Sequence, residues 1–142
     1  RGYVRASTNK ITDPPIIQPN YLKEKIDQDA LVEGVKICRS LLSTYTMKKI
    51  SVCETLPGDN IKSDKEILNF IRNKGATVYH AIGSCRMGVD NKAVVSPSLK
   101  INGLSNIRIA DASIMPTMPS GNTNAATLMI AEKASDLIKQ DL

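Results

Sequence analysis

The residue in this sequence best suited to move a proton is its single histidine, His80. Histidine is the one side chain that ordinarily changes charge between about pH 5 and 8. A lone histidine beside a strand is more often structural than catalytic, so residue type alone leaves both roles open. Gly83 and Gly88 follow within eight positions, and glycine allows a backbone to approach a ligand closely. Function concentrates in such loops, so we take His80 as the first candidate.

A second unusual segment runs from Met115 to Ala126. It contains two prolines and a glycine, followed by Asn122, Thr123 and Asn124, and it predicts an irregular approach to a helix start. The start of a helix presents unpaired N–H groups and the positive end of the helix dipole, which can hold negative charge on a ligand. Plain capping is the alternative, because Asn and Thr are both common N-caps.

The overall composition indicates a globular protein and argues against several functions. Of the 142 residues, 42% are hydrophobic and 23% charged, which is ordinary for a folded domain. The net charge of +5 is dispersed, Lys48-Lys49 is the only adjacent basic pair, and there is no Trp. Nucleic-acid binding needs a basic stripe interleaved with aromatic residues, so we expect none. No apolar stretch approaches the roughly 20 residues of a transmembrane helix.

The cysteines do not predict a metal site. Cys38, Cys53 and Cys85 have no zinc-finger spacing, and a single histidine cannot complete a typical zinc site. An odd number of cysteines prevents complete internal pairing, and the sequence assigns no disulfide.

Hydrophobic patterns predict the elements of the first half. Residues 2–7 alternate as a short strand does. Residues 23–42 have helical periodicity and predict a helix that buries the stripe Leu31, Val35, Cys38 and Leu42. Ser63, with Glu66 three residues later, forms a capping-box pattern and predicts a second helix that ends near Gly75.

The second half predicts short strands and one long helix. Residues 77–82 have strand character, Asn102-Gly103 is a turn dipeptide, and residues 107–110 alternate as a strand does. From Ala125 the pattern is helical, with Ala126, Ile130, Ala134 and Ile138 on one stripe. We expect that stripe to lack a partner within the chain, and hence the isolated chain to aggregate.

The motifs, taken in order, resemble a known enzyme family. The run Tyr79–Gly88 is similar to the His-x-x-Gly-Thr-Cys-x-Met-Gly element of the glucose–methanol–choline (GMC) oxidoreductases. Further motifs follow in the family's order at Ala93–Pro97, Asn102–Leu104, Ile107–Thr117, Ser120–Ala125 and Ile130–Ala134. The resemblance spans nearly the whole chain and is nearest to the insect glucose-dehydrogenase-like branch. Ser84 replaces the commoner Thr, and Ser96 replaces the usual Asp before Pro97.

The resemblance implies flavin chemistry on an alcohol or sugar hydroxyl. His80 matches the histidine that accepts the hydroxyl proton while a hydride passes from carbon to N5 of FAD. Asn122 matches the second polar residue, which would hydrogen-bond the substrate oxygen, and an amide cannot act as a base at neutral pH. The positions that match FAD contacts are Tyr79 beside the ring, Asp111 and Ala112 near the ribityl and pyrophosphate portion, and Thr123 and Asn124, whose backbone matches positions near the pyrimidine edge.

The expected fold class is α+β, as the carboxyl-terminal part of a two-domain flavoenzyme. Residues 1–76 would form a segment of the substrate-binding domain, with an antiparallel sheet and helices. Residues 77–142 would hold the active-site strand and loop and return to the FAD-binding domain with one strand and the final helix.

The FAD-binding half itself is expected to be a partner outside this sequence. The chain contains no Gly-x-Gly-x-x-Gly fingerprint after a strand, so by itself it is not expected to retain FAD or turn over. It begins without Met, as the interior of a longer polypeptide would, and indicates no cellular location. Two alternatives stay open: a non-catalytic relic of such an enzyme, and a lyase that keeps FAD for structure.

Overall fold

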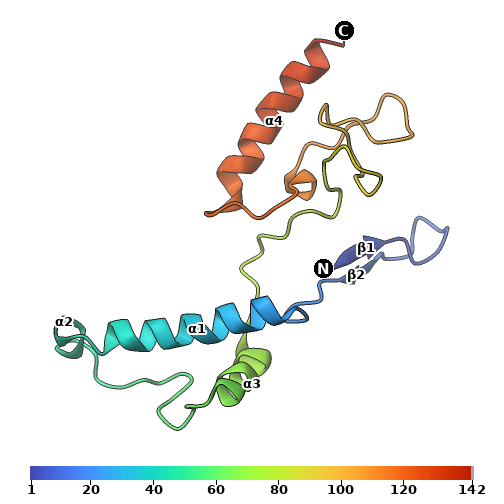
Figure 1. Cartoon of the computed structure of the whole chain (residues 1–142). Helices are drawn as coiled ribbons and strands as arrows, with labels where there is room; N and C mark the ends of the chain where they lie inside the picture. Colours follow the sequence, from blue (N-terminus) through green and yellow to red (C-terminus); the bar gives the residue numbers. More distant parts are fainter. Residues whose placement is uncertain (142) are drawn as a thin grey trace. The chain divides into compact units, whose positions relative to one another are not determined.

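The computed structural model describes residues 1–141, and these form two compact units (Figure 1). The first unit is Arg1–Ala76 and the second is Thr77–Leu142. The division falls after Ala76. Which domain of a longer enzyme each unit belongs to stays a prediction.

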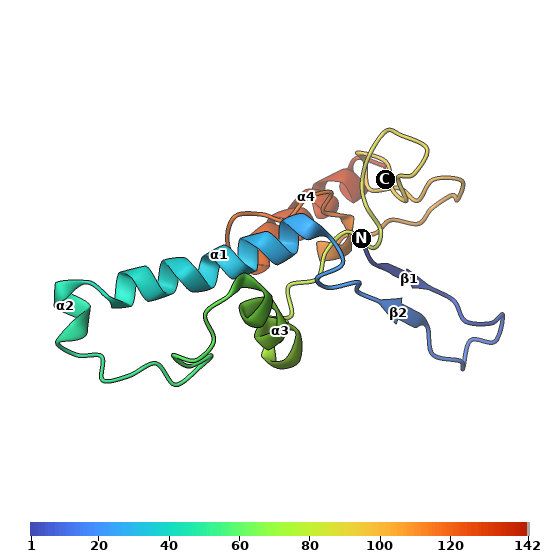
Figure 2. The ribbon, with the colours of Figure 1, turned by 60° about the horizontal axis from the view of Figure 1, so that its bottom comes forward.

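The first unit contains a two-stranded antiparallel sheet. Strand β1 (Tyr3–Arg5) pairs with β2 (Ile16–Gln18), with Val4 opposite Ile17, and Figure 2 shows the two strands side by side. The predicted strand within residues 2–7 is therefore confirmed. Together with the helices that follow, this sheet confirms the α+β class.

Three helices complete the first unit: α1 (Lys25–Leu42), α2 (Tyr45–Lys48) and α3 (Asp64–Lys74). Helix α1 packs against α3, and the side chains that become buried are Val32 on α1 and Ile67 on α3. The predicted helix is thus confirmed, but its buried stripe is wrong: Leu31, Cys38 and Leu42 are exposed and Val35 is half-buried. The periodicity predicted an apolar face of α1, but contact with α3 buries the neighbouring face, which contains Val32.

The capping box of α3 is confirmed. The backbone N–H of Glu66 donates to Ser63 Oγ at 3.3 Å, and the carboxylate of Glu66 accepts the N–H of Ser63 at 2.8 Å. Gly75 is the C-cap, as predicted, but its φ of −63° is open to any residue. Its glycine identity is explained by space, because a Cβ there would lie 2.5 Å from the carbonyl oxygen of Ile71.

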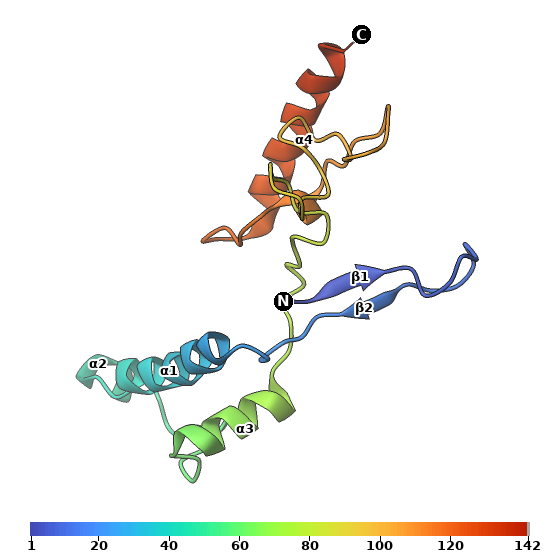
Figure 3. The same cartoon turned by 45° about the vertical axis from the view of Figure 1, so that its right-hand side comes forward.

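The second unit is built around helix α4 (Thr123–Lys139), with a short 3₁₀ helix η1 (Ala112–Ile114) and loops along one side (Figure 3). Its core consists of Val95, Leu99, Ile114, Met115, Ile130 and Ala134. The expectation that the α4 stripe lacks a partner is wrong: Ile130 is 7% exposed and Ala134 3%, because residues 95–115 cover them. Only Ile138, at 46% exposed, lies outside the core.

The two predicted strands of the second unit are not formed as continuous strands. Residues 77–82 are irregular because Tyr79 has a φ of +62°, which an extended run cannot contain. Residues 107–110 contribute one isolated antiparallel bridge, between Arg108 and Lys100. Leu99, next to Lys100, and Asn106, near Arg108, both have positive φ values, so the antiparallel pairing does not extend into a continuous strand. The Asn102-Gly103 turn is present, with Gly103 at a φ of +82°.

Within residues 1–141, no helix is long and apolar enough to cross a membrane. The three cysteines are free thiols. The same part of the chain contains no group of three or more His, Cys, Asp or Glu side chains that could hold a metal ion.

Candidate active site

The loop that follows His80 is anchored to η1. The backbone N–H of Cys85 donates to the carbonyl oxygen of Ser113 at 2.9 Å, and that of Met87 donates to the carbonyl oxygen of Ile114 at 2.8 Å. Gly83 turns the loop with a φ of +81°, and a Cβ there would lie 3.3 Å from the carbonyl oxygen of Met115. Because η1 also packs against α4, these bonds hold the loop beside the start of that helix.

The start of α4 is capped by Asn122. Its Oδ1 accepts the backbone N–H of Asn124 at 2.8 Å, so the helix begins at Thr123, two residues before the predicted Ala125. Thr123 is only 7% exposed and is the buried polar residue of the described chain. The alternative of plain capping is therefore correct for the Oδ1 atom of Asn122, but it does not explain the position of the Nδ2 group.

His80 joins the two segments that the sequence singled out. Its Nδ1 lies 2.8 Å from Thr123 Oγ1, and its Nε2 lies 3.2 Å from Asn122 Nδ2. These residues are more than 40 positions apart in the chain. The structure thus brings a possible base into direct contact with the first residues of a helix.

The orientation of the Asn122 amide follows from its cap. Only an oxygen can accept the N–H of Asn124, so Oδ1 faces the backbone and Nδ2 faces His80. The Nδ2 group is a donor only, so the Nε2 atom of His80 accepts from it through its lone pair. The site therefore presents one hydrogen-bond donor and one acceptor side by side.

The remaining predicted site residues lie outside this hydrogen-bonded group. Asp111 caps η1 by accepting the N–H of Ser113 at 2.7 Å, and Ala112 packs against the core. Tyr79 is 88% exposed, and its backbone N–H donates to Thr77 Oγ1 at 3.1 Å. The positive φ of Tyr79 is uncommon outside glycine, and strained residues of this kind often lie beside functional groups.

Sequence reasoning missed the side-chain role of Thr123. The resemblance implied a backbone position near a cofactor, whereas the structure shows its hydroxyl at the histidine ring. No spacing rule links Thr123 to a residue 43 positions earlier. The close run Asn122–Asn124 is the signal that the sequence offers, and it predicts either capping or ligand binding without involving His80.

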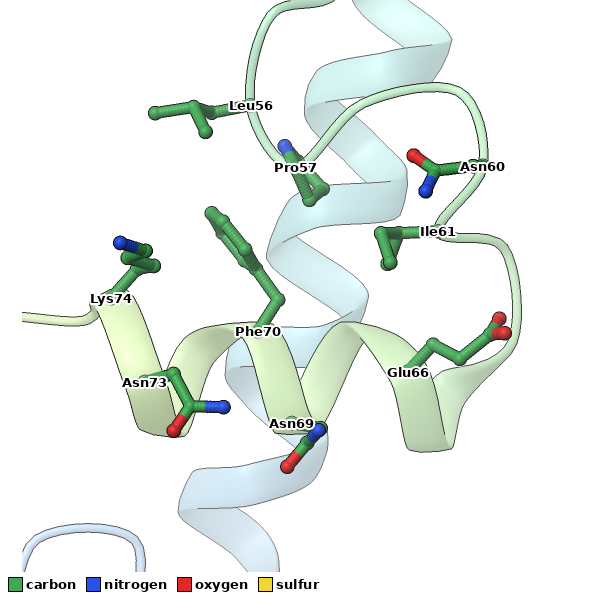
Figure 4. A pocket seen from close by; sticks show the side chains of 9 residues that line it. All are labelled: Leu56, Pro57, Asn60, Ile61, Glu66, Asn69, Phe70, Asn73 and Lys74. Atoms are coloured by element: carbon green, nitrogen blue, oxygen red, sulfur yellow. The ribbon is translucent and has the colours of Figure 1, made fainter.

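A separate pocket lies within the first unit, between α3 and the Pro57 loop (Figure 4). It measures about 400 Å³ and is open, and Phe70 points from α3 toward Pro57. Its carboxylate, Glu66, is already used by the capping box, and none of the predicted site residues lines it. We therefore place the candidate active site at His80 and not here.

Comparisons with known proteins place the chain in one family. A family model described as GMC oxidoreductase matches residues 1–131. The chain is 44% identical to an alcohol dehydrogenase [acceptor] of Pseudomonas putida, over 97% of its own length and 25% of that protein. It is 43% identical to the human mitochondrial choline dehydrogenase, over 97% of its own length and 24% of that protein.

Solved structures agree with this placement. Pyridoxine 4-oxidase from Mesorbium loti matches with a TM-score of 0.87 and 35% identity, over 95% of this chain and 26% of that one. A fungal aryl-alcohol oxidase matches with a TM-score of 0.84 and 28% identity, over 99% and 23%. The chain spans about a quarter of the length of these relatives, and its glucose-dehydrogenase-like branch stays a prediction. The family match and these relatives together show that the chain belongs to the GMC oxidoreductase family.

Proposed function

We propose that this chain is the carboxyl-terminal catalytic segment of an FAD-dependent oxidoreductase that oxidises the CH–OH group of an alcohol or sugar. The observation that carries the proposal is the pair formed by His80 Nε2 and Asn122 Nδ2, 3.2 Å apart. Two relatives, an alcohol dehydrogenase and a choline dehydrogenase, support the same class of substrate.

The pair matches the hydrogen-bonding needs of a hydroxyl group. A hydroxyl donates one hydrogen bond and accepts others, and the site offers one acceptor and one donor. A substrate hydroxyl placed between them would donate its proton to Nε2 of His80 and accept from Nδ2 of Asn122. The contact between Asn122 and His80 would then open to admit the oxygen.

His80 would act as the general base. As the carbon–hydrogen bond breaks, the hydroxyl proton would pass to Nε2, and Asn122 would hold the oxygen in line for that transfer. A base within hydrogen-bond reach of the proton is the geometric requirement for this catalysis. Asn122 itself cannot take up the proton at neutral pH, so the two residues have distinct roles.

The residues beside the pair fit a flavin. The first N–H groups of α4 lack intrahelical acceptors, and no acidic residue lies in its first turn to offset the positive end of the helix dipole. The backbone of Thr123 and Asn124 would lie near the pyrimidine edge there, and Tyr79, Asp111 and Ala112 would contact the rest of FAD. The flavin would supply the two-electron acceptor, and the protein supplies orientation and electrostatics. The main adenine-dinucleotide contacts would come from an amino-terminal FAD-binding half.

The test uses the intact flavoenzyme that contains this chain. Anaerobic mixing with an alcohol should bleach the flavin absorbance, and His80→Gln should slow that bleaching by about 10²–10⁴-fold while the flavin stays bound. An intact protein that binds flavin but is not bleached by any alcohol would favour the lyase, and one that binds none would favour the relic. Bleaching by His80→Gln at the unaltered rate would remove His80 as the base.

A further inference from the structure

We propose that Thr123 is a positioning residue whose hydroxyl accepts the Nδ1–H of His80 and so stabilises the ring tautomer in which Nε2 is the acceptor, the atom that a substrate hydroxyl would meet when the Asn122 contact opens. The inference rests on the proposed function, because it explains how His80 is kept ready as a base. It assigns the Thr123 side chain a role distinct from the backbone contact that the family resemblance implies.

The argument begins at the helix cap. The N–H of Asn124 fixes Oδ1 of Asn122, so Nδ2 of Asn122 points at His80 and Nε2 must accept. A neutral imidazole has one protonated nitrogen and one acceptor. If Nε2 is the acceptor, then Nδ1 carries the proton, and its partner at 2.8 Å is Thr123 Oγ1. The hydroxyl oxygen therefore accepts the Nδ1–H.

The opposite arrangement places two donors face to face. If Thr123 donated its hydroxyl proton to Nδ1, the neutral ring would carry its proton on Nε2, directed at the NH₂ group of Asn122. Two donors 3.2 Å apart form no hydrogen bond. Both contacts are satisfied together only when the proton lies on Nδ1.

Thr123 is well placed to stabilise this tautomer. It is 7% exposed, its β-branched side chain has few rotamers in a helix, and its carbonyl oxygen accepts the Thr127 hydroxyl at 2.8 Å. Which ring nitrogen is protonated is generally set by the bond that the other one makes. A hydroxyl in the first turn of a packed helix supplies that bond without adding a charge to the site.

The decisive comparison is Thr123→Val with Thr123→Ser in the intact flavoenzyme. Valine keeps the shape and removes the hydroxyl, whereas serine keeps the hydroxyl. With ¹⁵N-labelled histidine, the two ring-nitrogen signals of His80 are those missing in His80→Gln, and their chemical shifts report which nitrogen carries the proton. We expect the Nε2–H form to gain population in Thr123→Val. The rate of flavin reduction in Thr123→Val should fall about tenfold, which is the effect expected from the loss of one hydrogen bond. Thr123→Ser should restore both the tautomer and the rate.

Three results would overturn the inference. They are ring-nitrogen shifts in Thr123→Val that equal those of the unaltered enzyme, an unaltered rate of flavin reduction in Thr123→Val, and a Thr123→Ser variant that behaves like Thr123→Val. The flavin content of each variant, measured from its absorbance, shows whether the fold is intact. Failure of the proposed function is distinguishable, because it would appear as a normal rate in His80→Gln whatever the tautomer in the Thr123 variants.

Discussion

The amide of Asn122 serves the helix and the histidine at once: Oδ1 accepts the N–H of Asn124 at 2.8 Å, and Nδ2 lies 3.2 Å from Nε2 of His80. One side chain therefore caps the start of α4 and contacts the candidate base. A substitution that keeps the oxygen of this side chain but removes its NH₂ group can separate helix capping from the contact with His80.

Asn122→Asp should keep the helix and lose the reaction. Aspartate is as good an N-cap as asparagine, so the Asn124 N–H keeps its acceptor. The carboxylate has no N–H to donate, and it would attract a proton to Nε2 of His80. We expect flavin reduction to fall further than in Asn122→Ala, while the melting temperature of the intact enzyme stays close to that of the unaltered protein. Stopped-flow reduction and a thermal scan would measure both, and a rate above that of Asn122→Ala would contradict the expectation.

His80→Ala and Asn122→Ala should slow flavin reduction by different amounts. Loss of a positioned base should slow flavin reduction by about 10²–10⁴-fold. Loss of the amide donor should cost on the order of 10–10²-fold, if that bond contributes about 1.5–3 kcal/mol. Stopped-flow reduction of both variants by the same alcohol would measure the two losses, and an equal loss in both variants would contradict the expectation.

Local patterns in the sequence predicted the elements that local chemistry specifies. The capping box at Ser63 needs only neighbouring residues, and both of its bonds form. The helix within residues 23–42 was likewise predicted, but its buried face was not, because contact with α3 decides that face. The strand pattern of residues 77–82 was overridden by the positive φ of Tyr79, which no alternation of residue types reveals.

At the candidate site, residue types were predictable and contacts were not. His80 and Asn122 were identified by type and by resemblance to family motifs, yet no rule based on spacing predicts that they lie 3.2 Å apart. The same holds for Arg108, whose guanidinium reaches Asp141 at 2.6 Å across 33 positions. Long-range polar contacts of this kind depend on how the core places the backbone, and here that core is the cluster around Ile130.

Ile130 and Ile138 provide a matched test of the corrected core on one helix. Both were predicted on the same stripe of α4, but Ile130 is 7% exposed and Ile138 is 46% exposed. Ile130→Ala should cost about 2–5 kcal/mol, the usual range for a large-to-small change in a core. Ile138→Ala should cost much less. Urea unfolding monitored by signals from the second unit would measure both, and equal losses would show that the stripe is not packed as described.

The capping box of α3 should make that helix sensitive to acid. The Glu66 carboxylate accepts the N–H groups of Ser63 at 2.8 Å and Lys62 at 3.1 Å, and the bond from Ser63 is the largest cause that lowers the pKa of Glu66 in the folded protein. A carboxyl whose pKa is lower in the folded state than in the unfolded state contributes stability above its unfolded pKa, near 4.3 for glutamate. That contribution is lost as the pH falls through the folded pKa.

Glu66→Gln is the control, because glutamine also serves in a capping box but does not titrate. Near neutral pH, we expect the free energy of opening α3 to be higher in the unaltered protein than in Glu66→Gln. The difference should shrink steadily as the pH falls below about 4. Amide hydrogen exchange of α3, corrected for the intrinsic exchange rate at each pH, measures that difference and cancels the titration of other carboxyls. A difference that stays constant from neutral pH to about pH 3 would mean that the Glu66 carboxylate has the same pKa in the folded and unfolded states.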